Sequence, residues 1–279
     1  MKIFILLLLT FVSSSLFAQS RQFCERNRGD ILSLMQEPTA RMAFRNSGGI
    51  GNGGVCWWHS RFQRSSFFLA KFRPEKARPN ARQINDIVSG LRYMERVVEI
   101  PGYSNFESFT KDNQKQIQST LNAWQFADGV YNFQWLRGIS GNSALPPKDM
   151  EARMNSVYQS YKSSPAAMWV MAQMHGITSH SFLVLNIDQV NGGYDLDMID
   201  SNHPMEVVTV KYHVGDQFLV TNKSETRFVP YVGFQEDFRK ISKSLTGHCR
   251  NKTMELLEDF DDIRDGEIEL SNQAELEPR

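Results

Sequence analysis

The 279-residue sequence has no excess of charge of either sign and, after its first 18 residues, no long apolar run. Lysine and arginine number 31, and aspartate and glutamate also number 31, so the formal net charge is zero. A balanced charge does not attract a protein to nucleic acid or to an anionic membrane surface, and neither is expected as a partner. Because a membrane-spanning helix needs roughly 20 apolar residues, we also expect no integral membrane contact.

Metal-binding and phosphate-binding motifs are absent too. The sequence contains no Cys-x-x-Cys pair and no His-x-x-x-His pair, which are the common spacings of metal ligands. The glycine-dense run over residues 48–54 lacks the lysine and the preceding strand that a P-loop needs. We therefore expect no metal and no cofactor. No internal repeat is visible either, which argues against a solenoid or a propeller.

The first 18 residues have the composition of a secretory signal peptide. Lys2 precedes a short apolar run, and the small residue Ala18 precedes Gln19, so cleavage is expected near Ala18. A lipoprotein would need a cysteine directly after that position, and Cys24 lies too far along. We expect a periplasmic or extracellular protein.

The remaining chain of roughly 260 residues is long enough for one large domain or two small ones. We predict one domain over residues 19–250, helical over 19–176 and sheet-forming over 177–250. Residues 251–279 contain ten acidic and three basic side chains and few apolar ones, which predicts an acidic, partly disordered tail. The sequence does not indicate an oligomeric state.

Only three cysteines are present, so at least one is unpaired in a monomer. Cys24 lies near the start of the mature chain and Cys249 near the end of the predicted domain, and a disulfide between them is one possibility. Two separate thiols are the other, because a sequence does not give the Cα separation that a disulfide requires. Cys56 is the free thiol in the first case.

Apolar periodicity predicts helices in the first two thirds of the chain and strands afterwards, an α+β arrangement. A buried helix is expected to start near Cys56 and run to Phe72. Further helices are predicted over 79–99, 107–126, 149–161 and 165–175, and strands over 181–187, 194–199, 206–212, 217–221 and 227–232.

Cys56 and His180 are the candidate catalytic residues. Cys56 follows the glycine run and is expected at a helix N-terminus, which favours a thiolate and provides backbone N–H groups for a developing oxyanion. His180 begins a predicted strand, and the next strand ends at Asp200, so a carboxylate or the amide of Asn202 is placed to orient the imidazole. The alternatives are an inert buried cysteine and, for His59, a structural role.

Three segments carry a resemblance to a known family: Gly53-Gly54-Val55-Cys56-Trp57, Thr178-Ser179-His180-Ser181-Phe182-Leu183-Val184 and Asp200-Ser201-Asn202-His203-Pro204. Their order, and the 124 positions between the cysteine and the histidine, resemble the papain-like cysteine peptidases. The resemblance implies a fold in which a helical part carrying the cysteine helix packs on a C-terminal antiparallel sheet. It also implies a thiol hydrolase that cleaves a peptide or amide substrate.

The resemblance suggests a role for each site residue. Cys56 is the nucleophile, His180 its base, and Asp200 the orienting group, favoured over Asn202. A papain-type enzyme has a glutamine six positions before the cysteine, where this sequence has Ile50. Asn52 is therefore the candidate oxyanion donor, with a turn residue as the alternative reading.

Two other functions remain open at this level. One is a non-catalytic secreted protein that uses a papain-like cleft to bind a peptide or a partner, because a fold does not guarantee chemistry. The other is an acyltransferase or deamidase on the same scaffold. Disulfide exchange is a weaker reading, since no second cysteine lies near Cys56 in the sequence.

Overall fold

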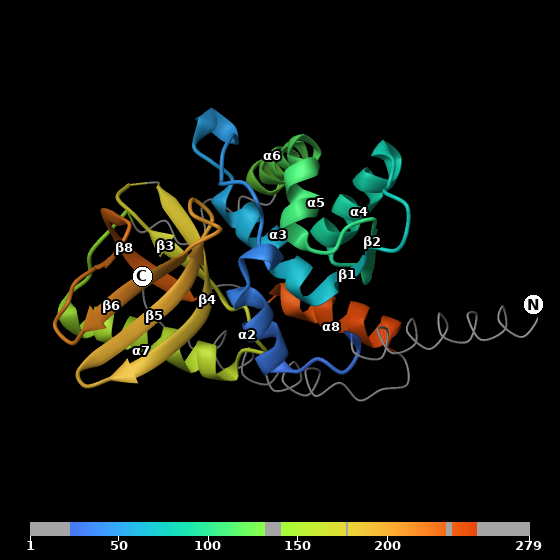
Figure 1. Cartoon of the computed structure of the whole chain (residues 1–279). Coiled ribbons are helices and arrows are strands. Elements are labelled where there is room, and N and C mark those ends of the chain that lie inside the picture. Colours follow the sequence, from blue (N-terminus) through green and yellow to red (C-terminus); the bar gives the residue numbers. More distant parts are fainter. Residues whose placement is uncertain (1–22, 132–140, 177, 233–235, 250–279) are drawn as a thin grey trace, which may run out of the picture.

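The computed structural model in Figure 1 describes residues 23–131, 141–176, 178–232 and 236–249. A helical N-terminal part packs on a C-terminal antiparallel barrel, which confirms the predicted α+β class and the order of helices before strands. The predicted signal peptide and acidic tail lie outside the described residues. The extent of the domain, residues 19–250, stays a prediction.

The helical part is built around α3, which begins at Cys56. Every residue of α3 except Arg61 is buried. The elements of this part are α2 (Arg28–Gln36), η1 (Pro38–Ala40), η2 (Ile50–Asn52), α3 (Cys56–Leu69), β1 (Ala70–Arg73), α4 (Ala81–Tyr93), β2 (Val98–Pro101), α5 (Phe106–Asp112) and α6 (Gln114–Tyr131). Strands β1 and β2 pair in parallel.

The C-terminal part is a closed barrel in which β8 pairs with β3, with Pro230 opposite Ala172. Its strands are β3 (Trp169–Gln173), β4 (Ser179–Val190), β5 (Gly193–Asp200), β6 (Val207–His213), β7 (Leu219–Thr221) and β8 (Ser224–Val232). Helix α7 (Pro147–Ser163) precedes the barrel and packs along it, whereas α8 (Glu236–His248) returns to the helical part.

Strand β3 is buried along its whole length, and its side chains are divided between two apolar cores. Trp169 and Met171 belong to the core that contains α3, and Val170 and Ala172 belong to the core inside the barrel. Successive side chains of a strand point to opposite faces, so β3 contributes to both cores. Strands β4 and β5 also place residues in both cores, and α3 packs on this part of the sheet.

The helix predicted over 165–175 is wrong. Residues 169–173 form β3, and every one of them is buried. A strand covered on both faces reads as a continuous apolar run, which periodicity alone does not separate from a buried helix.

Three other helices were predicted with the wrong ends. The helix from Cys56 stops at Leu69 and is followed by β1, and the helix over 79–99 stops at Tyr93, where Met94 has a left-handed backbone with φ 58°. The helix over 107–126 is divided into α5 and α6 at Asn113. In each case the apolar pattern continues past the residue at which the helix ends.

A disulfide joins Cys24 to Cys249, which settles the open pairing and leaves Cys56 as the free cysteine. The Cα atoms are 5.7 Å apart and the two residues are separated by 225 positions in sequence. A link of this kind stabilises a fold by roughly 2–5 kcal/mol, because it restricts the unfolded chain. It is consistent with the predicted export to an oxidising compartment. Across the described residues, no helix combines the length and apolar character needed to cross a membrane.

Candidate active site

The structure brings Cys56, His180 and Asp200 together. Cys56 is the first residue of α3 and only 9% exposed, and its Sγ lies 3.8 Å from the carbonyl oxygen of Ser179. His180, the second residue of β4, lies close enough to Cys56 for the thiol to raise the pKa of the imidazole. The His180 Nε2 atom lies 2.6 Å from Asp200 Oδ1. Because Nε2 of His180 is bonded to the carboxylate, Nδ1 is the ring nitrogen available to interact with the thiol.

Backbone pairing and a buried hydroxyl fix this arrangement. In the antiparallel pair of β4 and β5, Phe182 lies opposite Asp200, so the carboxylate at the end of β5 meets the imidazole near the start of β4. The fully buried Ser181 Oγ donates to the carbonyl oxygen of Cys56 at 2.8 Å and contacts Ser60 Oγ at 2.9 Å. Sequence reasoning does not single out Ser181, although it is the link that holds α3 against β4.

The electrostatics of the trio favour a charged imidazolium. Burial lowers the pKa of His180, but hydrogen bonds to Asp200 and to Cys56 outweigh it and raise the pKa to about 10. Burial likewise raises the pKa of Asp200, and the bond to His180 outweighs it, so the pKa of this carboxyl is lowered. The ring is therefore held as an imidazolium beside the thiol at neutral pH.

His59 lies close to this trio but has a structural environment. It is buried, and its Nε2 donates to the carbonyl oxygen of Phe44 at 2.9 Å. Burial lowers the pKa of His59 to about 4, so the ring is neutral at physiological pH. A neutral ring with a backbone partner orients Phe44 rather than moving a proton.

The N-terminus of α3 presents unused backbone donors next to the thiol. The residue before the helix is Val55, which has no side chain able to cap it, and the structure shows no side-chain cap. The first intrahelical bond runs from the His59 N–H to the Val55 carbonyl, so the N–H groups of Cys56 and Trp57 precede that ladder. These donors and the helix dipole suit an oxyanion.

Asn46 joins this helix terminus to the loop after Asp200, although sequence reasoning does not single it out. Its Oδ1 accepts from the Val55 N–H, its Nδ2 donates to Asn202 Oδ1 at 3.2 Å, and its own N–H donates to the Ser201 carbonyl at 2.6 Å. A Cβ at Gly54, whose φ is 89°, would lie 2.5 Å from Asn46 Nδ2. Glycine is needed here so that the amide can reach Val55.

We expect Asn46→Ala to lower the free energy of unfolding by about 1–3 kcal/mol, because the partly buried Val55 N–H loses its acceptor. The matched control is Asn202→Ala, which removes only the exposed partner of the same amide and should cost less than about 1 kcal/mol. Urea unfolding of both variants measures the difference. Equal costs would show that the Val55 bond contributes nothing.

The two remaining predicted residues lie at the edge of the trio. The Asn202 N–H donates to Asp200 Oδ1 at 2.8 Å, while its side chain accepts from Asn46, so the carboxylate is the group bonded to His180. Asn52 is exposed in η2, with φ 57°, the left-handed region that asparagine tolerates. The structure thus places Asn52 in a turn, and its role as an oxyanion donor stays a prediction.

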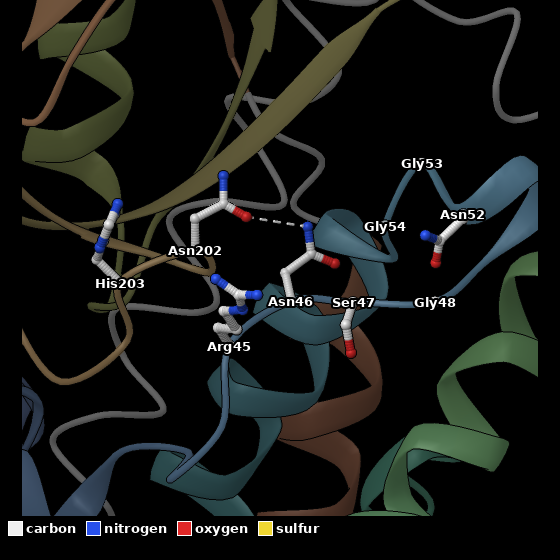
Figure 2. Close-up of a pocket in the computed structure, with 9 residues that line it drawn as sticks. All are labelled: Arg45, Asn46, Ser47, Gly48, Asn52, Gly53, Gly54, Asn202 and His203. Atoms are coloured by element: carbon white, nitrogen blue, oxygen red, sulfur yellow. Dashed lines mark hydrogen bonds between the residues drawn. The ribbon is translucent and has the colours of Figure 1, made fainter.

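A polar pocket of about 360 Å³ is lined by residues that precede Cys56 and follow Asp200 in the chain, although no member of the trio lines it. Figure 2 shows Asn202 and His203 at one side, Asn52, Gly53 and Gly54 at the other, and Arg45 and Asn46 between them. Gly54 lies two positions before Cys56 and Asn202 two positions after Asp200. The pocket therefore adjoins both the cysteine and the acid segments.

Among the described residues, no group of three or more His, Cys, Asp or Glu side chains is arranged to hold a metal ion. Comparisons with protein-family models, with curated proteins and with solved structures found no match for this chain.

Proposed function

We propose that this chain is an exported, papain-like thiol hydrolase that cleaves peptide or amide bonds. The observation that carries the proposal is the placement of the His180 ring, which is bonded to the Asp200 carboxylate and has its pKa raised by the Cys56 thiol. Nucleophile, base and orienting acid stand in the order that covalent thiol catalysis needs. The resemblance of the three sequence segments to papain-like peptidases supports the same reading.

The proposed reaction has two halves. The Cys56 thiolate attacks the carbonyl carbon of the substrate, and the electron pair moves to the oxygen, which the N–H groups at the start of α3 stabilise. The His180 imidazolium then gives its proton to the leaving amine as the C–N bond breaks, leaving a thioester. Water, deprotonated by His180, attacks this thioester, and the carboxylic acid leaves as the C–S bond breaks, which restores the Cys56 thiolate and the His180 imidazolium.

Asp200 acts on the ring rather than on the substrate. Its hydrogen bond to Nε2 holds Nδ1 toward the thiol and stabilises the positive charge on the imidazolium. The same machinery with an amine in place of water would be an acyltransferase, and with a side-chain amide as substrate it would be a deamidase. No contact among the described residues favours these over hydrolysis, so hydrolysis is the proposal.

We expect Cys56 to react with iodoacetamide at pH 6 at a rate within about fivefold of its rate at pH 8.5. A thiol with an ordinary pKa of about 8.5 would be less than about 1% ionised at pH 6 and would slow more than a hundredfold. Because Cys24 and Cys249 are disulfide-bonded, Cys56 is the thiol that mass spectrometry should find labelled.

Cys56→Ala is the control for both labelling and turnover, the latter followed with dye-quenched casein. Casein cleavage that is abolished by Cys56→Ala supports a hydrolase. Labelling that starts only above pH 8, together with no turnover, would overturn the proposal and favour a non-catalytic protein with a binding cleft.

A further inference from the structure

The pocket beside the trio is lined by uncharged groups and two side chains that carry or can gain positive charge. The lining residues are Arg45, Asn46, Ser47, Gly48, Asn52, Gly53, Gly54, Asn202 and His203. No acidic side chain lines it. Amide and hydroxyl groups with one guanidinium and one imidazole form a surface that binds oxygen anions.

Arg45 is exposed, and within the described part of the chain it forms no hydrogen bond or ion pair. By contrast, Arg61 and Arg64 nearby in sequence are held by Asp237. Figure 2 shows the Arg45 guanidinium beside the amides of Asn46 and Asn202. A guanidinium with open donors offers the paired N–H groups that fit a carboxylate.

The acidic side chains near His203 are each bonded to another residue, so they do not cancel the positive charge of the pocket. Asp200 is bonded to His180, and Glu206 is paired with Lys223. Neither carboxyl group lines the pocket. An incoming anion would therefore meet Arg45 and the amide donors first.

We propose that this pocket is a specificity subsite that binds the carboxylate of an acidic residue in the peptide substrate, with Arg45 as its main contact. The inference rests on the proposed thiol hydrolase, because the pocket adjoins Gly54 before Cys56 and Asn202 after Asp200. Its volume of about 360 Å³ exceeds that of a glutamate side chain. Acidic peptides are the substrate class that follows.

Tripeptidyl chloromethyl ketones test this, because the thiolate displaces chloride and forms a thioether that mass spectrometry locates at Cys56. Each probe contains one glutamate and two alanines, and the set places glutamate at each of the three positions in turn. Each probe is compared with one in which glutamine, which has nearly the same shape, replaces the glutamate. We expect one position at which the glutamate probe reacts about tenfold faster than the glutamine probe. The preference should shrink in 0.5 M NaCl, because Arg45 is exposed to solvent.

Arg45→Gln should remove the preference, so that the glutamate and glutamine probes react at rates within about twofold of each other. The matched control is Arg82→Gln, which makes the same charge change at an exposed position of α4 that does not line the pocket. Arg45→Glu should reverse the preference toward lysine-containing probes.

The outcomes separate the two proposals. If glutamine probes label Cys56 but no position prefers glutamate, or if Arg45→Gln leaves the preference intact, the subsite is overturned and the hydrolase stands. A third outcome is that no probe labels Cys56 in the folded protein, although iodoacetamide alkylates Cys56 once the protein is unfolded. In that case the proposed function fails, and the subsite fails with it.

Discussion

His180→Ala should slow the reaction of Cys56 with iodoacetamide at pH 6 by at least about a hundredfold. In the native site the hydrogen bonds to Asp200 and Cys56 outweigh burial and raise the pKa of His180 to about 10, so the ring is an imidazolium at pH 6. A positive charge next to a thiol stabilises the thiolate. Without that charge the stabilisation of the thiolate is lost, so the reaction should require a more alkaline pH.

The pH profile separates this effect from a loss of structure. His180→Ala leaves Asp200 buried and without its partner, which is costly, so the variant must be shown to be folded by circular dichroism. Asp200→Asn is the second variant, since it keeps the shape and leaves His180 in place. It should lower the rate at pH 6 less than His180→Ala does, because the imidazole remains.

His213→Ala serves as the control, because this histidine lies on β6 with a side chain 64% exposed. It should leave the alkylation profile unchanged. Equal rates at pH 6 for the native protein and a folded His180→Ala variant would mean that the imidazolium does not act on the thiol, and the dyad would have to be abandoned.

The sequence predicts the candidate trio because each member lies at or near the end of an element. Cys56 begins α3 one residue after a glycine run, His180 is the second residue of β4, and Asp200 ends β5. Such positions are marked locally by turn residues and by a change of periodicity. A hairpin between β4 and β5 then brings the histidine and the acid together without any long-range information.

Local sequence patterns do not predict the residues that support the trio. Asn46 acts through Val55 and through Asn202, and the latter is 156 positions away in sequence. Ser181 acts through the carbonyl oxygen of Cys56. Nothing local distinguishes these side chains from ordinary loop and strand residues, because their roles exist only once α3 has packed on β4.

Two features of the fold also differ in whether a local sequence pattern indicates them. The closure of the barrel depends on β8 pairing with β3, a contact between distant segments that no local pattern indicates. Helix α8, by contrast, has a detectable signal that was missed. Phe238, Ile241 and Leu245 are all buried, and their spacing of three and four places them on one helical face.

Asp237→Asn should lower the free energy of unfolding by about 3–5 kcal/mol, because it breaks a buried ion-pair network. Asp237 Oδ1 lies 2.8 Å from Arg61 Nη2, and its Oδ2 contacts both Arg61 Nε, at 2.9 Å, and Arg64 Nη2. Arg64 is fully buried, so an uncharged residue at position 237 removes the carboxylate charge that offsets the charge of Arg64. Thermal or urea unfolding measures the loss, expected as a fall in melting temperature of roughly 6–20 °C.

Acid unfolding of the native protein gives an independent measure of the same network. Burial opposes ionisation, but the charges of Arg61 and Arg64 outweigh it and lower the pKa of Asp237 from 3.8 to about 2. A lowered pKa stabilises the fold above pH 4, and the contribution of about 2 kcal/mol is lost as the pH falls from 4 to 2. Asp237→Asn should remove this part of the pH dependence.

The network matters for the site because it fixes α8 to the helix that carries Cys56. Asp237 binds two arginines of α3 at the start of α8, and Cys249 ties the other end of α8 to Cys24. Adding Arg64→Met to Asp237→Asn should recover part of the lost stability, since Arg61 keeps its contact with Asp128 at 3.2 Å. The control is Asp86→Asn, whose pair with Arg96 is exposed and should cost less than about 1 kcal/mol. If Asp237→Asn costs no more than Asp86→Asn, the buried network does not hold α8 in place, and the disulfide alone would have to anchor it.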